Sequence, residues 1–409
     1  MNFYLLLILF LLLASYAFDT LVELLNLNSL RVGLPKAAKD IYTNKKYTKS
    51  QKYLRESTKF GLLSSTISTA LTVVILLSPA FSAFDSFARR YTETEIGLGL
   101  FFFFTVLVLT TLYSLPFSIY KTFVIEEKYG FNKTTPQTFV TDLVKSFLLT
   151  VIIGLPIAAI VISFFQFFGG NSWIYIWIFL SLFQLFMLFI APVVIMPLFN
   201  KFTPLPKGNL RSEIEAYAKS QNFKLEGIYT MDGSKRSSKS NAFFTGFGKF
   251  KRIALFDTLI EKQTTQELVA VLAHEIGHYK KGHILKQLVM GLSFTGFTLF
   301  IFSRFIGNET LLQALGFEIP SIYASLIAIG LLYSPVSEVF GMVTNFFSRK
   351  FEFEADAYAV NTYNNPKALE TALKQLSSDN LTNLTPHPLK VFIDYSHPPV
   401  LERLKAIRG

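Results

Sequence analysis

Long apolar runs separated by short polar connections occupy most of this chain, and their lengths predict membrane-spanning helices. A helix needs about 20 apolar residues to cross the hydrocarbon core of a bilayer, because each residue advances it by about 1.5 Å. Seven runs reach or approach that length: 3–26, 60–84, 97–125, 143–168, 172–199, 285–307 and 320–347. Residues 3–18 lack the basic start and the cleavage site of a signal peptide, so we expect an uncleaved first helix.

Two polar regions, 200–284 and 348–409, interrupt or follow these runs. In the first we expect a small α+β unit with a helix near 210–221, strands near 227–231, 242–247 and 252–256, and a hairpin turn at 246–249. Thr264 and Glu267 have the spacing of a capping box, which predicts that a second helix begins there. The second region is expected to be helical, with helices beginning near Pro366 and after Pro399.

Composition supports the membrane interpretation. The chain is 51% hydrophobic and only 16% charged, with 44 Phe, which is unusual for a soluble domain. We therefore expect a mainly α, multi-pass membrane protein. The net charge of +11 comes from Lys and Arg beside apolar runs, which favours contact with anionic membrane lipid and argues against nucleic acid. Because there is no Cys, any metal must be held by His and carboxylates.

The distribution of basic residues predicts the orientation. Residues 27–59 carry nine Lys and Arg, whereas the connections 169–171 and 308–320 carry none. With seven spans, residues 27–59, residues 200–284 and the C-terminus fall on one side of the membrane. The positive-inside rule places that side in the cytoplasm, although Arg89 and Arg90 are discordant.

The run from His274 to His278 contains the residues of a metal-dependent hydrolase. Side chains four residues apart share one face of a helix, so His274 and His278 can bind one ion. Glu275 lies about 100° further round, where it can act as general base towards the attacking water. The spacing predicts a zinc site with hydrolytic chemistry.

A catalytic zinc site needs a third protein ligand. His283 follows too far along, and on a continuous helix it points away unless Gly282 breaks that helix. Glu352 is a better candidate, because it stands in an acidic cluster after the last apolar run. Glu352 and Asp356 share a helical face, so one can bind the metal while the other orients a ligand histidine; Glu354 points elsewhere.

Several motifs together resemble those of the type I CAAX prenyl proteases, which are integral-membrane zinc endopeptidases. The resemblance covers nearly the whole chain and rests on residues 240–242, 251–259, 273–283, 348–359 and 396–399. It implies a ring of seven transmembrane helices around a large chamber, with a zincin-like protease domain at the cytoplasmic end. It also implies a prenylated or membrane-delivered peptide as substrate, cut to remove the last three residues of a CAAX protein.

The same resemblance implies roles for individual residues. Glu352 is expected to be the third zinc ligand, which leaves Asp356, on the same helical face, to orient a ligand histidine. Asn241 is expected to bind the substrate backbone, and His397 to stabilise the oxyanion of the tetrahedral intermediate. Arg403 is expected to support substrate binding at the same site.

We therefore expect the protease domain to be split by membrane spans. The expected parts are spans one to five with a basic loop at 27–59 (1–199), the first protease segment (200–284), spans six and seven (285–347) and the second protease segment (348–409). The short 308–320 connection and the C-terminus, which lacks a dilysine signal, favour a bacterial plasma membrane protein. In a eukaryote the endoplasmic reticulum is expected.

Two other functions are compatible with these residues. One is quality control of membrane proteins, the function of the heat-shock membrane protease HtpX. Comparing cleavage of farnesylated and unlipidated versions of one peptide would distinguish this function from CAAX processing. The other is a transporter or lipid-binding protein whose metal is structural, which a fourth protein ligand would indicate.

Overall fold

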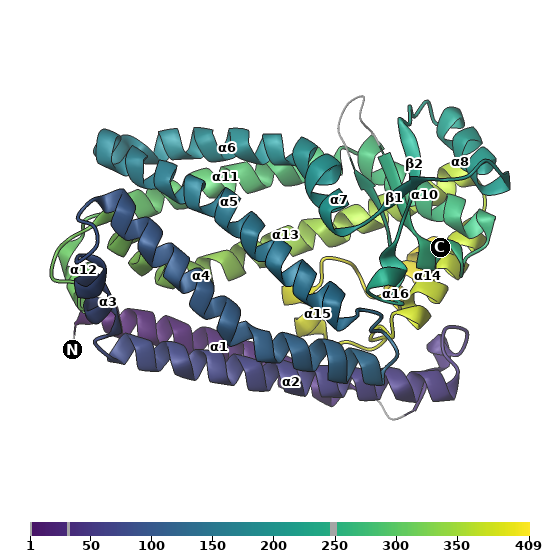
Figure 1. Ribbon diagram of the computed structural model, residues 1–409. Coiled ribbons are helices and arrows are strands. Elements are labelled where there is room, and N and C mark those ends of the chain that lie inside the picture. Colours follow the sequence, from purple (N-terminus) through teal and green to yellow (C-terminus); the bar gives the residue numbers. More distant parts are fainter. Residues whose placement is uncertain (1, 31–32, 246–251) are drawn as a thin grey trace.

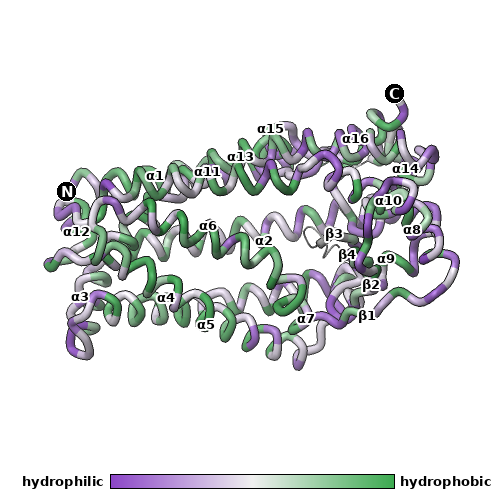
Figure 2. Tube along the Cα trace, turned by 90° about the horizontal axis from the view of Figure 1, so that it is seen from above, coloured by the Kyte–Doolittle hydropathy of each residue, from purple (hydrophilic) through white to green (hydrophobic). Residues whose placement is uncertain are grey.

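The computed structural model describes residues 2–30, 33–245 and 252–409, which form long helices and one small sheet (Figure 1). The long helices are α1 (Phe3–Ser29), α2 (Asn44–Leu77), α4 (Glu95–Tyr120), α5 (Pro136–Phe168), α6 (Ser172–Ile190), α11 (His283–Ser303) and α13 (Ile322–Tyr363). The polar residues gather at the end of the molecule that carries the sheet, as Figure 2 shows. The N-terminus lies at the opposite end.

Shorter elements join and cover the long helices. They are α3 (Ala80–Ala88), α7 (Met196–Phe199), α8 (Asn209–Ser220), α9 (Asp257–Ile260), α10 (Thr265–Lys280), α12 (Glu309–Ala314), α14 (Pro366–Asp379), α15 (Pro388–Asp394) and α16 (Val400–Arg408). Three 3-10 turns, at Lys36–Ala38, Gly169–Asn171 and Gly233–Lys235, and two π-helical turns, at Lys121–Glu126 and Ala191–Ile195, complete the helical structure of the described residues.

Six segments are long and apolar enough to cross a membrane. One of them, residues 136–199, contains both α5 and α6, and the chain turns back between them at Gly169–Asn171 (Figure 1). The mainly α, multi-pass class is therefore confirmed. The arrangement is consistent with the expected ring of seven helices.

Some predicted boundaries were wrong. The predicted span 60–84 ends early, because α2 stops at Leu77 and α3 follows as a separate helix. Pro79 lacks a backbone N–H and stands at this break, and Ser78 before it is extended. Much of the expected 27–59 loop is helical, since α2 already begins at Asn44.

The sheet contains β1 (Phe202–Pro204), β2 (Gly227–Met231), β3 (Ala242–Thr245) and β4 (Arg252–Phe256), in the order β1-β2-β4-β3. Strands β2 and β4 are parallel, and the other two pairings are antiparallel. The predicted strands β2, β3 and β4 are confirmed, and the predicted turn at 246–249 lies outside the described residues. The capping box of Thr264 and Glu267 before α10 is also confirmed.

The first connection packs against the domain that carries the sheet. Ile41 and Tyr42 belong to the same hydrophobic core as residues of α8, α10 and α14. The Tyr42 hydroxyl donates to the Ser377 carbonyl over 2.8 Å, and Lys46 lies 3.3 Å from Asp379. The basic start of α2 and the sheet domain therefore lie on the same side of the membrane helices.

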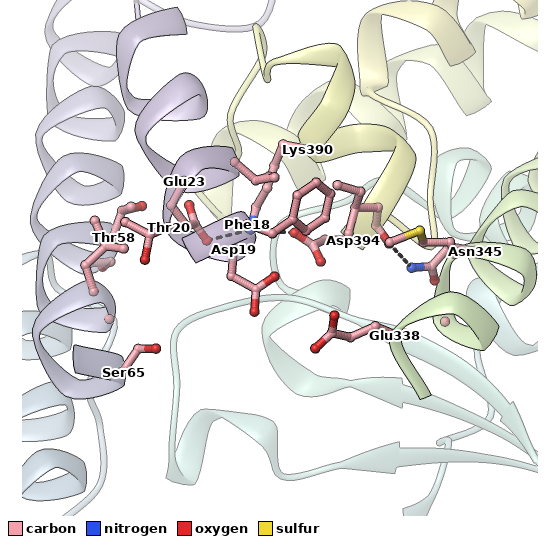
Figure 3. Close-up of a pocket in the computed structure, with 17 residues that line it drawn as sticks. Phe18, Asp19, Thr20, Glu23, Thr58, Ser65, Glu338, Asn345, Lys390 and Asp394 are labelled. Carbon is pink, nitrogen blue, oxygen red and sulfur yellow. Dashed lines mark hydrogen bonds and ion pairs between the residues drawn. The ribbon is translucent and has the colours of Figure 1, made fainter. Parts of the chain in front are cut away.

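Between α1, α2, α13 and α15 lies a cavity of about 640 Å³ that several ionisable side chains line (Figure 3). Asp19 and Glu338 both point into it. Lys390 lies 2.5 Å from Glu23 and 2.6 Å from Asp394. Ionisable side chains on membrane helices face water or protein interiors, because exposing them to lipid is costly. The cavity is therefore consistent with the expected chamber.

Helices α10 and α13 pack closely at Gly277. A Cβ at this position would lie 3.1 Å from both the Cα and the carbonyl oxygen of Ala355. Neither backbone atom can move aside as a side chain can. Glycine therefore lets the α10 backbone approach α13 at the point where both helices carry predicted site residues.

Replacing Gly277 with alanine is expected to push the two helices apart. We predict that Gly277→Ala lowers the free energy of unfolding by about 1–3 kcal/mol, as overpacking in a well-packed core does. Thermal unfolding of the purified protein in detergent measures the effect. The control is Gly330→Ala on α13, where a Cβ meets open space. Equal unfolding temperatures for the two variants would contradict the close approach.

Candidate active site

Helices α10 and α13 bring three potential metal ligands together. The Nε2 atoms of His274 and His278 lie 3.1 Å apart. Glu352 Oε1 lies 3.2 Å from His278 Nε2, and Glu352 Oε2 lies 3.4 Å from His274 Nε2. The donor atoms of all three side chains fall within 4.8 Å of one another. The three residues predicted as ligands therefore converge on one point.

The chemistry of this cluster suits a metal cation. Two imidazole nitrogens and a carboxylate are a donor set that zinc uses in catalytic sites. Glu352 Oε2 is buried and accepts no hydrogen bond from the described residues, although Arg403 Nη1 lies 3.0 Å away. Burial lowers the pKa of His274, but hydrogen bonds to Asp356 and Glu352 outweigh burial and raise that pKa to about 9. The site therefore stabilises positive charge, as it would a bound metal.

Asp356 and Arg403 form a buried network of charged side chains that contacts His274 and Glu352. Asp356 is 2% exposed, and its Oδ1 lies 2.9 Å from His274 Nδ1. Arg403 of α16 donates to Asp356 twice, from Nε to Oδ2 over 2.8 Å and from Nη2 to Oδ1 over 2.6 Å. Burial alone would raise the pKa values of Asp356 and Glu352, but their cationic and hydrogen-bonding neighbours lower both. Arg403 thus offsets part of the negative charge of the two carboxylates that face the histidines.

One cavity of about 730 Å³ unites the remaining predicted residues with this cluster. Its lining includes Asn241, His274, Glu275, His278, Glu352, His397 and Arg403. Burial raises the pKa of Glu275. The His397 side chain is 64% exposed, and its Nε2 lies 3.4 Å from Glu352 Oε1. Every predicted site residue except Asp356 therefore borders the same space, and their catalytic roles stay predictions.

Asn241 stands exposed immediately before β3, and the chain that leads to it is held in place. The Ser240 amide donates to Asn380 Oδ1 over 3.1 Å, and Asn380 Nδ2 donates back to the Ser240 carbonyl over 3.2 Å. Asn241 Oδ1 accepts from the Ala242 amide over 2.9 Å. The two hydrogen bonds between the Asn380 side chain and the Ser240 backbone thus set the position of Asn241. Nothing in the sequence indicated this role for Asn380.

Sequence reasoning also missed a pair beside His278. Helix α10 ends at Lys280, and Gly282, with a φ of +67°, separates it from α11, which His283 begins. His283 Nδ1 lies 3.0 Å from His278 Nδ1, on the side of the ring opposite the metal-type cluster. His283 Nε2 lies 3.1 Å from Glu354 Oε2. Glu354 points away from the cluster, as expected, but it meets a histidine that contacts a predicted ligand.

Comparison with known proteins places this geometry in a family. Residues 204–409 match the model of peptidase family M48. Residues 23–201 match a model described as the CAAX prenyl protease N-terminal region with five membrane helices. The chain belongs to peptidase family M48. It is therefore an integral-membrane metalloendopeptidase, and the expected relationship to the type I CAAX prenyl proteases is confirmed.

Individual members of the family are similar over almost the entire chain. CAAX prenyl protease 1 homolog from Arabidopsis thaliana is 38% identical, over 96% of this chain and 95% of that protein. The Homo sapiens CAAX prenyl protease 1 homolog is 35% identical, over 92% and 88% respectively. The crystal structure of S. mikatae Ste24p matches with a TM-score of 0.95 and 33% identity, over 100% of both chains.

The buried position of Arg403 predicts a large effect of its removal. We expect Arg403→Ala to lower the free energy of unfolding by about 3–5 kcal/mol, because it leaves Asp356 and Glu352 buried without their cationic partner. Thermal unfolding of the metal-free protein measures this. In the control Arg211→Ala, an exposed pair with Glu215 is broken, and the expected loss is below about 1 kcal/mol. Similar losses in both variants would argue against the network.

Proposed function

We propose that this membrane metalloendopeptidase uses zinc and removes the last three residues of prenylated CAAX proteins, or cuts similar membrane-delivered peptides. The names of its relatives, which are 35–38% identical over most of the chain, support the substrate class. The observation that carries the proposal is the single cavity shared by the His274, His278 and Glu352 donors, Glu275 and Asn241.

Zinc would be held by His274, His278 and Glu352, whose donor atoms already converge. When bound, it supplies a Lewis acid that polarises the scissile carbonyl and makes water a better nucleophile at neutral pH. Asp356 then orients His274 through Nδ1, and Arg403 keeps Asp356 ionised.

The protein's own residues move the protons and position the peptide. Glu275 takes a proton from the attacking water and passes it to the leaving nitrogen as the C–N bond breaks. His397 donates a hydrogen bond to the carbonyl oxygen as negative charge develops there. Asn241 binds the peptide backbone. It directly precedes β3, which pairs with β4 alone among the described strands, so an extended substrate can add to its free edge.

The apolar part of the cavity fits the proposed substrate. Val271, Leu369, Leu373 and Leu376 line it together with the polar residues. Burying aliphatic side chains against such a wall is favourable by roughly 25 cal/mol per Å². The aliphatic residues of a CAAX sequence can pack against this wall. The lipid tail can then lie in the chamber between the membrane helices.

We propose that the site faces the cytoplasm. The first connection packs against α14, which places the basic start of α2 beside the sheet domain, and basic residues favour the cytoplasmic side. The exposed Lys45, Lys49 and Lys52 would contact anionic membrane lipid there. The membrane is that of a bacterial cell or, in a eukaryote, the endoplasmic reticulum.

The protease domain is proposed to consist of residues 200–284 and 348–409, with the membrane helices as the other parts. The boundary at 347/348 lies within α13, which is continuous from Ile322 to Tyr363. The final membrane helix therefore delivers Glu352 directly to the site.

Cleavage of a farnesylated CAAX peptide by the purified protein tests the proposed function. We expect release of the C-terminal tripeptide, loss of activity with a zinc chelator, and recovery when zinc is returned. In Glu275→Gln, turnover should fall at least about 100-fold while zinc stays bound, because only the general base is lost. The exposed Glu261→Gln is the matched control. Normal turnover by Glu275→Gln would refute the mechanism.

A second experiment separates CAAX processing from membrane-protein quality control. The same peptide is compared with and without its farnesyl group. A CAAX protease should show a much higher kcat/KM for the lipidated peptide, since the tail adds binding energy. Equal kcat/KM values, together with cleavage of unfolded membrane proteins, would favour the HtpX-like function.

A further inference from the structure

We propose that His283 and Glu354 are positioning residues, which hold His278 in the tautomer and ring orientation that metal binding requires. The proposal rests on the metal site proposed above. It assigns a use to a buried histidine and a carboxylate that the mechanism leaves unused.

The two nitrogens of His278 face different partners. Its Nε2 lies 3.1 Å from His274 Nε2 and 3.2 Å from Glu352 Oε1, so it belongs to the proposed ligand set. Its Nδ1 lies 3.0 Å from His283 Nδ1. His283 Nε2 in turn lies 3.1 Å from Glu354 Oε2. The side chains therefore form a chain of hydrogen-bond distances that leads from the metal position to a carboxylate.

The direction of these hydrogen bonds follows from the chemistry of imidazole. A ligand nitrogen must be unprotonated, so His278 carries its proton on Nδ1 once Nε2 binds a metal. That N–H donates to His283 Nδ1, which must then be the unprotonated nitrogen of its own ring. His283 therefore carries its proton on Nε2 and donates it to Glu354. When both rings are neutral and Glu354 is ionised, only this arrangement of protons satisfies the contacts of His283, and it is the one that leaves His278 Nε2 free for the metal.

The two proposed ligand histidines are thus supported in parallel ways. His274 meets a carboxylate directly, since Asp356 Oδ1 lies 2.9 Å from its Nδ1. His278 is linked to a carboxylate indirectly, because it contacts His283, which in turn contacts Glu354. Metal-binding histidines commonly donate their second N–H to a carboxylate or carbonyl, which raises their basicity and fixes the ring.

His283 is itself held firmly. His283 is only 1% exposed. Its ring stacks on the ring of Phe351, with the two centroids 4.2 Å apart and the two planes 11° apart. The left-handed backbone conformation of Gly282 turns the chain so that the His283 side chain contacts His278 on α10. Both members of the pair stand on helices that continue from the membrane, since His283 begins α11 and Glu354 lies on α13.

The test compares variants that keep or remove the hydrogen bonds. His283→Phe retains the ring that stacks on Phe351 but loses both bonds, whereas His283→Gln can still accept from His278 and donate to Glu354. Glu354→Leu removes the final acceptor, whereas Glu354→Gln keeps an acceptor oxygen. We expect zinc affinity, measured by competition with a chromophoric chelator, to fall about 10–100-fold in His283→Phe and Glu354→Leu. The two glutamine variants should stay within a few-fold of the wild type.

The matched control is Glu318→Gln at an exposed position remote from the site, which should leave zinc affinity unchanged. A purely structural role predicts the opposite order: His283→Phe would be tolerated, His283→Gln would unfold more easily, and zinc affinity would not change in any folded variant. That result would overturn the proposal. If His283→Phe does not fold, the Glu354 variants decide, because that side chain is 32% exposed.

The experiment also separates this proposal from the proposed function. If Glu275→Gln still cleaves but His283→Phe loses zinc affinity, the mechanism fails and the positioning role stands. If the wild-type protein binds no zinc at this site, both are overturned.

Discussion

The contact between α10 and α13 is the constraint on which the site depends. Gly277 lets the α10 backbone meet Ala355, and at that separation His274 and His278 reach Glu352. The contact also brings carboxylates together in a buried place. Glu275, Glu352 and Asp356, when ionised, face a single guanidinium from Arg403, so neutral histidines leave two negative charges. A divalent cation would balance them.

This arrangement ties the chemistry to the membrane helices. Helix α13 runs without interruption from a membrane span to the acidic cluster, and α11 begins a single residue after Gly282. The first connection and α2 pack on the same domain from another side. The protease site is therefore assembled from segments that are far apart in sequence and are brought together by the packing of the spans. Assembly of the site therefore requires the membrane helices to be packed together.

The features that follow from local periodicity could be predicted from the sequence. The membrane helices, the capping box of Thr264 and the pairing of His274 with His278 each depend on spacing within a single element. Glu352 lies much further along the chain, and its prediction needed both its spacing from Asp356 and the resemblance to a family.

Features that depend on tertiary contacts or on single backbone angles could not be predicted. Strand β1 has three residues and exists because it pairs with β2. The end of α2 at Leu77 was missed because prolines are tolerated in membrane helices, and nothing local marked Pro79 as different. The contact of His283 with His278 depends on the positive φ of Gly282, which the residue type permits but does not require.

The central claim is that His274, His278 and Glu352 hold one catalytic zinc ion. Anomalous diffraction at the zinc absorption edge, from crystals of the purified protein, tests it most directly. The account predicts one strong peak within about 2.0–2.2 Å of a donor atom from each of the three side chains, with no fourth protein ligand. A peak at another place, or a fourth protein ligand that closes the site, would contradict it.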